Sequence, residues 1–157
     1  MSQLNKVVFV LFAFALFTMN STVSFAHEHK QAKGHVTVED AWARATFALA
    51  KTGAVYLKLN NQSKHDITLL SVKVDSSIAF DAQLHETLMD DGMMQMREAE
   101  HGFEIPAGES LSFQPGGKHI MLMGLEKALN TGDKFVLSLV FENNKVMRVP
   151  IEVKDAR

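Results

Sequence analysis

Residues 54–60, AVYLKLN, carry the pattern that decides the fold class. Val55, Leu57 and Leu59 recur at every second position. Because successive side chains of a β-strand point to opposite faces, this period of two predicts a strand with one buried face. Similar segments recur outward along the chain in both directions. The predicted strands are His35–Glu39, Ala54–Asn60, Ile67–Val74, Ile78–Glu86, Met93–Glu98, Leu111–Phe113, His119–Leu125, Phe135–Phe141 and Val146–Val153.

Turn-forming residues separate these segments, for example at Asn60-Asn61, Asp91-Gly92, residues 115–117 (PGG) and Asn143-Asn144. Gly, Pro and Asn favour turns because of their backbone preferences. No segment shows a sustained helical repeat, although residues 41–51 (AWARATFALAK) are compatible with one turn or a short helix. Many short strands at close spacing predict a single all-β domain, either an antiparallel sandwich or a Greek-key barrel.

The first 26 residues differ in composition from the rest. Lys6 precedes an apolar run from Val7 to Phe17, and a polar stretch then ends at Ala26. This is the pattern of a cleaved secretory signal peptide, and the run is shorter than the about 20 apolar residues that a membrane span needs. The expected division is residues 1–26 as signal peptide, 27–34 as a flexible His-containing leader, and 35–157 as the folded domain. After cleavage the product would not span a membrane.

Composition narrows the range of functions. The sequence has no cysteine, which excludes disulfides, thiolate ligands and a lipid-bearing lipoprotein cysteine. With 16 basic and 18 acidic residues the formal net charge is −2, so no basic excess is present to neutralise phosphates. Nucleic acid is therefore not an expected partner.

Residues 84–100, LHETLMDDGMMQMREAE, are rich in methionine and yet too polar for a core segment. Residues 115–124, PGGKHIMLMG, carry a second group. In a strand His119 and Met121 share one face, as does Met123 if the strand stays regular, and Met94 and Met96 share a face with Met93 opposite. Imidazole and thioether together suit a soft ion, of which Cu(I) is the common choice.

Other metals fit this set of residues less well. Structural zinc sites use Cys or several His, calcium and magnesium use clustered oxygen ligands, and blue-copper centres need a Cys thiolate. A structural interpretation is also available, because methionine often fills cores and a single strand histidine is commonly packed and hydrogen-bonded. In that case the chain would be a β-sandwich interaction module that binds no metal.

The segments VEDAWARAT, GAVYLKLNN, LHET, GMMQMR, IPAGES and PGGKHIMLMGL resemble those of the periplasmic copper chaperones of the PCuAC type, and the resemblance covers nearly all of residues 35–153. It implies a cupredoxin-like β-sandwich that binds one Cu(I) through His85, Met96, His119 and Met121. Ten residues separate His85 from Met96, as in the family pattern, but 22 separate Met96 from His119, one more than usual. We expect the extra residue in a turn near Glu98–Gly102, since an insertion within a strand would turn Met96 away from His119.

The same resemblance implies a periplasmic carrier that delivers Cu(I) to the copper centre of cytochrome c oxidase, directly or through a Sco-type thioredoxin-like partner. A copper-sequestering or resistance protein would use the same ligands and is the alternative. Catalysis is not expected, because no nucleophile motif such as G-x-S-x-G is present.

Accessory metal ligands are predicted in two places. If cleavage follows Ala26, the new amino terminus, two amide nitrogens and the third-residue imidazole of His29 form a nitrogen set suited to Cu(II). His27 and His35 are further candidates for this second site. Met94 and Met123 are candidate soft ligands beside the main site, and Met94 is a credible substitute for Met96 because the two share a face.

Overall fold

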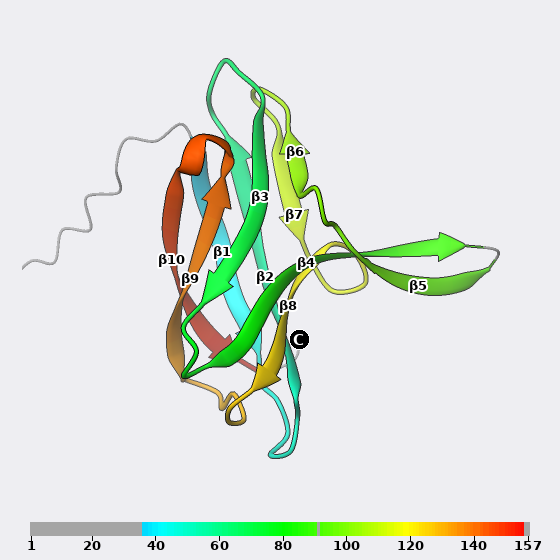
Figure 1. The fold of residues 1–157 in the computed structure, drawn as a ribbon, viewed down its shortest axis with the longest axis vertical. Helices are drawn as coiled ribbons and strands as arrows, with labels where there is room; N and C mark the ends of the chain where they lie inside the picture. The colour runs from blue at the N-terminus through cyan, green and yellow to red at the C-terminus, as the bar shows by residue number, and fades with distance from the viewer. Residues whose placement is uncertain (1–35, 91, 156–157) are drawn as a thin grey trace, which may run out of the picture. The chain divides into compact units, whose positions relative to one another are not determined.

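The computed structural model describes residues 36–90 and 92–155, which form an almost entirely β structure (Figure 1). The predicted signal peptide and leader lie outside the described residues. The described part of the chain forms ten strands and one 3-10 turn. These are β1 (Val36–Arg44), β2 (Thr52–Asn61), β3 (Ile67–Val74), β4 (Ala79–Asp90), β5 (Met93–Glu98), β6 (Phe103–Ile105), β7 (Ser110–Phe113), β8 (His119–Leu125), β9 (Lys134–Phe141), η1 (Glu142–Asn144) and β10 (Val146–Lys154).

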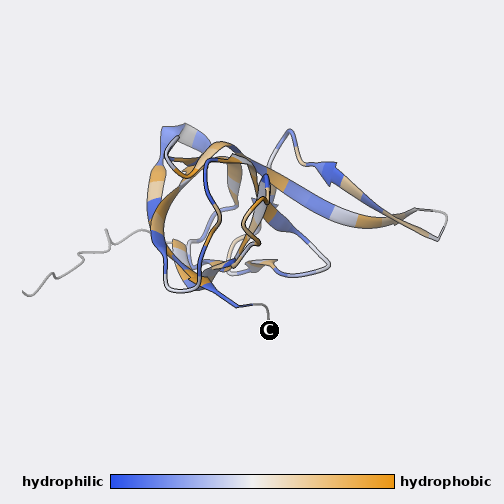
Figure 2. Cartoon of the chain, turned by 90° about the horizontal axis from the view of Figure 1, so that it is seen from below, coloured by the Kyte–Doolittle hydropathy of each residue, from blue (hydrophilic) through white to orange (hydrophobic). Residues whose placement is uncertain are grey.

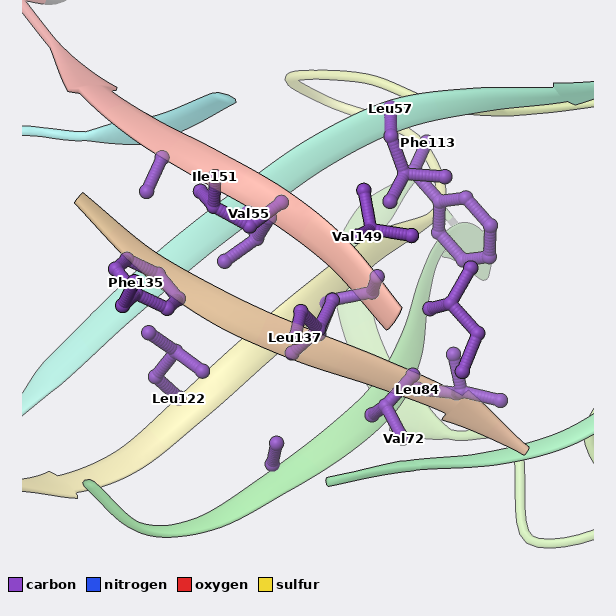
Figure 3. Packing of buried hydrophobic residues seen from close by; sticks show 14 of the residues in the cluster. Val55, Leu57, Val72, Leu84, Phe113, Leu122, Phe135, Leu137, Val149 and Ile151 are labelled. Carbon is purple, nitrogen blue, oxygen red and sulfur yellow. The ribbon is translucent and has the colours of Figure 1, made fainter. Parts of the chain in front are cut away.

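The strands belong to one hydrogen-bonded sheet in the order β5-β4-β8-β2-β1-β10-β9-β3-β6, with β7 paired to β2 beside this path. The neighbours are antiparallel, as predicted, except that β1 and β10 run parallel with Trp42 opposite Glu152. The sheet curls, so that β3, β9 and β10 lie across from β2, β4 and β8 (Figures 1 and 3). The predicted all-β sandwich class is confirmed.

The core lies between these two layers and is built from the apolar face of each strand. Leu57 and Leu122 come from one layer, Leu137 and Ile151 come from the other, and none of the four is more than 2% exposed. Figure 3 shows such side chains meeting across the interior. Burying each one contributes roughly 1.5–3 kcal/mol to folding. Polar and apolar residues alternate along many strands (Figure 2). The face of each strand that points away from the core can therefore carry polar or ligand-binding side chains.

The segment 41–51 differs from its prediction. β1 continues through Trp42, and only a turn separates it from β2. The ring of Trp42 lies 4.8 Å from that of Tyr56, centroid to centroid, and the two residues are directly paired across the strands. Asp40 has φ +51 at a shift in register, so a β-bulge re-aims the strand just before Trp42. Cross-strand pairing therefore overrides the local preference of this segment.

Two further differences concern strand length. β4 runs to Asp90, four residues beyond the predicted end at Glu86, because β5 pairs with it over that length. β6 was not predicted, since three residues are too few to show a period. Within residues 36–90 and 92–155, no helix has the length and hydrophobicity needed to cross a membrane.

Candidate metal centre

β8 presents histidine and methionine on the outer face of the sheet. Ile120 and Leu122 are fully buried, and the side chains that alternate with them, His119, Met121 and Met123, are half-buried. The strict alternation arises because each apolar residue is held in the core. The prediction that these three side chains share a face is confirmed by the burial pattern.

β4 adds the second histidine beside the first. His85 is paired directly with His119 in the antiparallel register, and Gln83 is paired with Met121. Directly opposed residues of a sheet project from the same face. The two imidazole rings are 5.7 Å apart, centroid to centroid, and are tilted by 51°. Two histidines that are 34 positions apart in the sequence thus become neighbours.

Beyond His85, β4 pairs with β5 alone, and the two strands extend past the others (Figure 1). We call this hairpin, residues 86–98, the arm. Thr87 is opposite Met96 and Met89 is opposite Met94, so these side chains share the face of His85. Met93 is opposite Asp90 and therefore projects from the other face. Figure 2 shows hydrophobic residues along this extended hairpin.

The turn between β5 and β6 occupies residues 99–102, the region expected to hold the extra residue of the spacing. The pairing of His85 with Glu98 is regular, so Met96 keeps the face of His85 and is not turned away. Gly102 has φ +74, and a Cβ atom there would lie 2.0 Å from the carbonyl oxygen of Leu69. Only glycine fits this close approach without displacing the backbone.

A groove of about 440 Å³ joins these elements on the outer face. Four of the predicted or accessory ligands line it, namely His119, Met121, Met94 and Met96. The other lining residues are Arg44, Thr46, Thr52, Gly53, Ala54, Tyr56, Thr87, Gln95 and Gly116. His85 adjoins this set through His119 without lining the groove itself.

Each histidine has one ring nitrogen engaged within the protein. Nδ1 of His119 donates to the carbonyl oxygen of Gly117 at 3.0 Å, which leaves Nε2 with a free lone pair. Nε2 of His85 lies 3.1 Å from Oε1 of Gln83, and Nε2 of Gln83 donates to a carboxylate oxygen of Asp81 at 3.1 Å. The chain of Asp81, Gln83 and His85 is consistent with a proton on Nε2 of His85.

That arrangement leaves Nδ1 of His85 as an acceptor. Within the described chain this atom is buried and has no hydrogen-bond partner. A buried polar atom without a partner is costly unless something binds it. Engagement of the other ring nitrogen by a neighbouring group is the usual way in which proteins orient a metal-binding histidine. His85 therefore offers a lone pair on Nδ1, and His119 offers one on Nε2.

Comparison with known proteins agrees with this fold. The profile of the family described as "Putative lipoprotein LpqE-like" matches residues 36–153. The chain belongs to the LpqE-like family. It is 41% identical over 126 residues to "Putative lipoprotein Lxx21020" of Leifsonia xyli, which covers 80% of this chain and 73% of the relative.

Solved structures similar to this LpqE-like chain include PCuAC domains, so the fold implied by the motifs is confirmed. The apo PCuAC domain of PmoF1 is 22% identical, covers 78% of this chain and 96% of its own, and has a TM-score of 0.64. DR1885 of Deinococcus radiodurans was solved in solution in apo and CuI forms, which are 30% and 27% identical with TM-scores of 0.60 and 0.59. These two matches cover 78% and 76% of this chain, and 80% and 77% of DR1885.

The electrostatics around His85 favour a neutral imidazole. Burial, followed by the charge of His119, lowers the pKa of His85 below the ordinary value of 6.5, while Glu98 has a smaller opposing effect. A lowered pKa keeps the imidazole unprotonated, which is the form that binds metal. The described residues contain no group of three or more His, Cys, Asp or Glu arranged to hold an ion. By their softness, two imidazoles with thioethers suit a soft monovalent ion better than zinc or calcium.

The predicted accessory ligands differ in placement. His27 and His29, with His35, lie outside the described residues, so the proposed Cu(II) site remains a prediction. Met94 lines the groove next to Met96. Met123 is opposite Asp81 and Thr52, four residues along β8 from His119, or about 14 Å at the rise of a strand.

Sequence reasoning missed several residues around the ligands. Tyr56 is only 7% exposed, and it lines the groove from the outer face of β2. Arg44 reaches the same groove from β1. Gln83, which contacts His85, carried no motif. The only available signal was its spacing of two from His85 on a predicted strand.

Proposed function

We propose that this protein is a periplasmic Cu(I) chaperone whose cargo ion is held by His85, Met96, His119 and Met121. One observation carries the proposal: strand register brings two imidazoles with free lone pairs and two or more thioethers to one face, although they come from three strands. Soft, neutral ligands of this kind select Cu(I) over harder divalent ions. DR1885, which shares the fold, has a solved CuI form.

The geometry also suits release of the ion. Met96 is 60% exposed on the arm, and the groove is open, so an incoming ligand can reach the metal without unfolding the protein. Thioethers are neutral, and they can be exchanged one at a time for ligands of an acceptor protein. No redox change is required, because Cu(I) enters and leaves in the same oxidation state. These features favour a carrier over an enzyme.

The proposed destination is the copper centre of cytochrome c oxidase, reached directly or through a Sco-type partner. The predicted signal peptide at residues 1–26 supports export to the periplasm, and a relative whose name includes the word lipoprotein is consistent with export. Sequestration of copper is the competing function, since the same ligands would serve it.

Anaerobic titration with Cu(I) against a chromophoric chelator tests the site. We expect one tightly bound ion, with affinity reduced in both His85→Ala and Met96→Ala. His65→Ala is the matched histidine control, because His65 is exposed in the loop before β3. Met93→Leu is the matched methionine control, because Met93 is 63% exposed on the same strand but on the opposite face. Failure to compete with the chelator, or equal effects of the controls, would refute the assignment.

Delivery is separated from sequestration by a transfer experiment. The Cu(I)-loaded protein is mixed with the apo copper domain of an oxidase subunit, with and without a Sco-type protein, and the copper bound to each is measured after separation. A chaperone passes its ion to one of these acceptors faster than the acceptor takes up Cu(I) that dissociates freely from a chelator. A sequestering protein retains the ion and leaves the acceptors empty.

A further inference from the structure

The arm carries a second group of thioethers that the proposed site does not use. Met89 on β4 is directly opposite Met94 on β5, which places their Cβ atoms about 5 Å apart. The two side chains are 68% and 72% exposed. Exposure of two adjacent large apolar side chains is unfavourable unless they have a ligand or a partner.

This pair is continuous with the proposed copper site. Met94 and Met96 are two residues apart on β5 and share a face, so they are about 7 Å apart along the strand. Both line the groove that also contains His119 and Met121. The thioethers thus form a row that leads from the two histidines along the arm, through Met96 and Met94, to Met89.

We propose that Met89 and Met94 form a second, thioether-only Cu(I) station on the arm, through which the ion passes between the histidine site and an acceptor. The inference rests on the proposed function of the histidine site. The flexible, unbranched methionine side chain allows a thioether to span part of the 7 Å step. Cu(I) accepts low coordination numbers, so two thioethers with a transient third from Met96 are sufficient.

The passage is a series of ligand exchanges that balances at each step. The Cu–N bond to one imidazole breaks as a Cu–S bond to Met94 forms, and Met96 keeps its Cu–S bond during the step. The second Cu–N bond and the Cu–S bond to Met121 then break as Met89 bonds to the ion, which leaves three thioethers on the ion until Met96 also leaves. The oxidation state stays at Cu(I), and both released imidazoles stay neutral, so neither an electron nor a proton has to be supplied.

The hairpin supplies its own control. Met93 is 63% exposed, close to the value for Met94, but it is opposite Asp90 on the other face of the arm. If exposed methionines bound soft metals non-specifically, Met93 would bind them as well as Met89 and Met94 do. A station defined by strand register involves Met89 and Met94 and leaves Met93 unaffected.

The test is a titration with Ag(I), a soft monovalent ion that does not oxidise in air, into protein expressed from the full-length sequence with ¹³C-methyl methionine. Met→Leu variants assign each methyl signal. We expect the first equivalent to shift the methyl signals of Met96 and Met121, and the second to shift those of Met89 and Met94 with no shift at Met93. The Met89→Leu/Met94→Leu variant should lose the second event and release Cu(I) to a chelator more slowly than Met93→Leu does.

The outcomes distinguish this inference from the proposed function. If Met96 and Met121 respond but Met89 and Met94 do not, the station is refuted and the histidine site stands. If Met89 and Met94 respond while Met96 and Met121 do not, the proposed histidine site is refuted, and the station loses its role in transfer although the arm binds the ion. Equal shifts at Met93 would show non-specific binding and overturn the station. Equal release rates for the double variant and Met93→Leu would remove its role in transfer.

Discussion

Gln83→Leu is the sharpest test of how the protein prepares His85 for its ligand. The side-chain oxygen of Gln83 accepts from Nε2 of His85 at 3.1 Å, and its amide donates to Asp81 at 3.1 Å. Leucine keeps most of the volume but cannot accept a hydrogen bond. Without the acceptor, the proton is free to move to Nδ1 of His85, the ring nitrogen that we expect to bind copper.

The size of the effect follows from this one contact. A neutral hydrogen bond contributes about 1 kcal/mol net, and 1.36 kcal/mol corresponds to a factor of ten. Loss of the contact to His85 should therefore weaken Cu(I) binding about fivefold. Loss of an outer partner of a metal ligand generally costs about 10- to 100-fold. We expect Gln83→Leu to raise the Kd about five- to tenfold.

The assay is competition with a chelator under anaerobic conditions, together with long-range ¹H–¹⁵N spectra of the metal-free protein. The spectra report which nitrogen of His85 carries the proton. Gln62→Leu is the control, because Gln62 is exposed in the loop after β2 and donates a hydrogen bond to Thr37. An unchanged Kd, or a wild-type spectrum with Nδ1 already protonated, would refute the proposed role of Gln83.

Two more predictions follow from the site and from the turn beside it. The pKa of His85 in the folded protein is lowered below its ordinary value of 6.5. Between the folded-state pKa and 6.5, the unfolded chain therefore binds more protons than the folded chain does. The free energy of unfolding should rise with pH in this range, and this stability should be lost as the pH falls below 6.5. Urea midpoints of metal-free protein between pH 5 and 8 should show this dependence, and His85→Gln should show less of it; an NMR pKa of 6.5 or above for His85 would contradict the prediction. Gly102→Ala should lower the free energy of unfolding by at least about 1–2 kcal/mol, the cost of a left-handed backbone for an L-residue, with more from the clash with Leu69. Thermal unfolding measures this, and Gly108→Ala, which has a similar φ but open space around its Cβ, separates the two costs.

The elements that could be predicted are those in which a local period reports burial. Leu57 and Leu59 alternate on β2, and His119-x-Met121 alternates with two fully buried residues on β8. In both strands one face is buried in the core, so the alternation of residue types in the sequence predicts which side chains share a face. The shared face of His119 and Met121 could therefore be predicted without the structure.

The features that local periodicity could not predict depend on register between strands, which a single segment does not encode. The pairing of His85 with His119 requires β4 and β8 to be neighbours, and the parallel pairing of β1 with β10 brings together strands from the two ends of the domain. Arg44 and Tyr56 enter the groove for the same reason. Arginine is an ordinary surface residue and tyrosine occurs both in cores and on surfaces, so local patterns had nothing to distinguish these two residues.

The proposed ligands lie partly on the packed sheet and partly on the arm, and this difference affects release of the ion. His85 and His119 lie where β4 and β8 are paired within the sheet, next to Leu84 and Ile120, which are buried in the core. Met96 lies on the arm, where no residue of β5 is buried and pairing involves two strands only. A two-stranded ribbon without a core behind it is marginally stable, so moving Met96 costs less than moving either histidine. Met96 can therefore follow the ion as it leaves the two fixed imidazoles, and it can keep its Cu–S bond while the Cu–N bonds break and Met94 and Met89 take over.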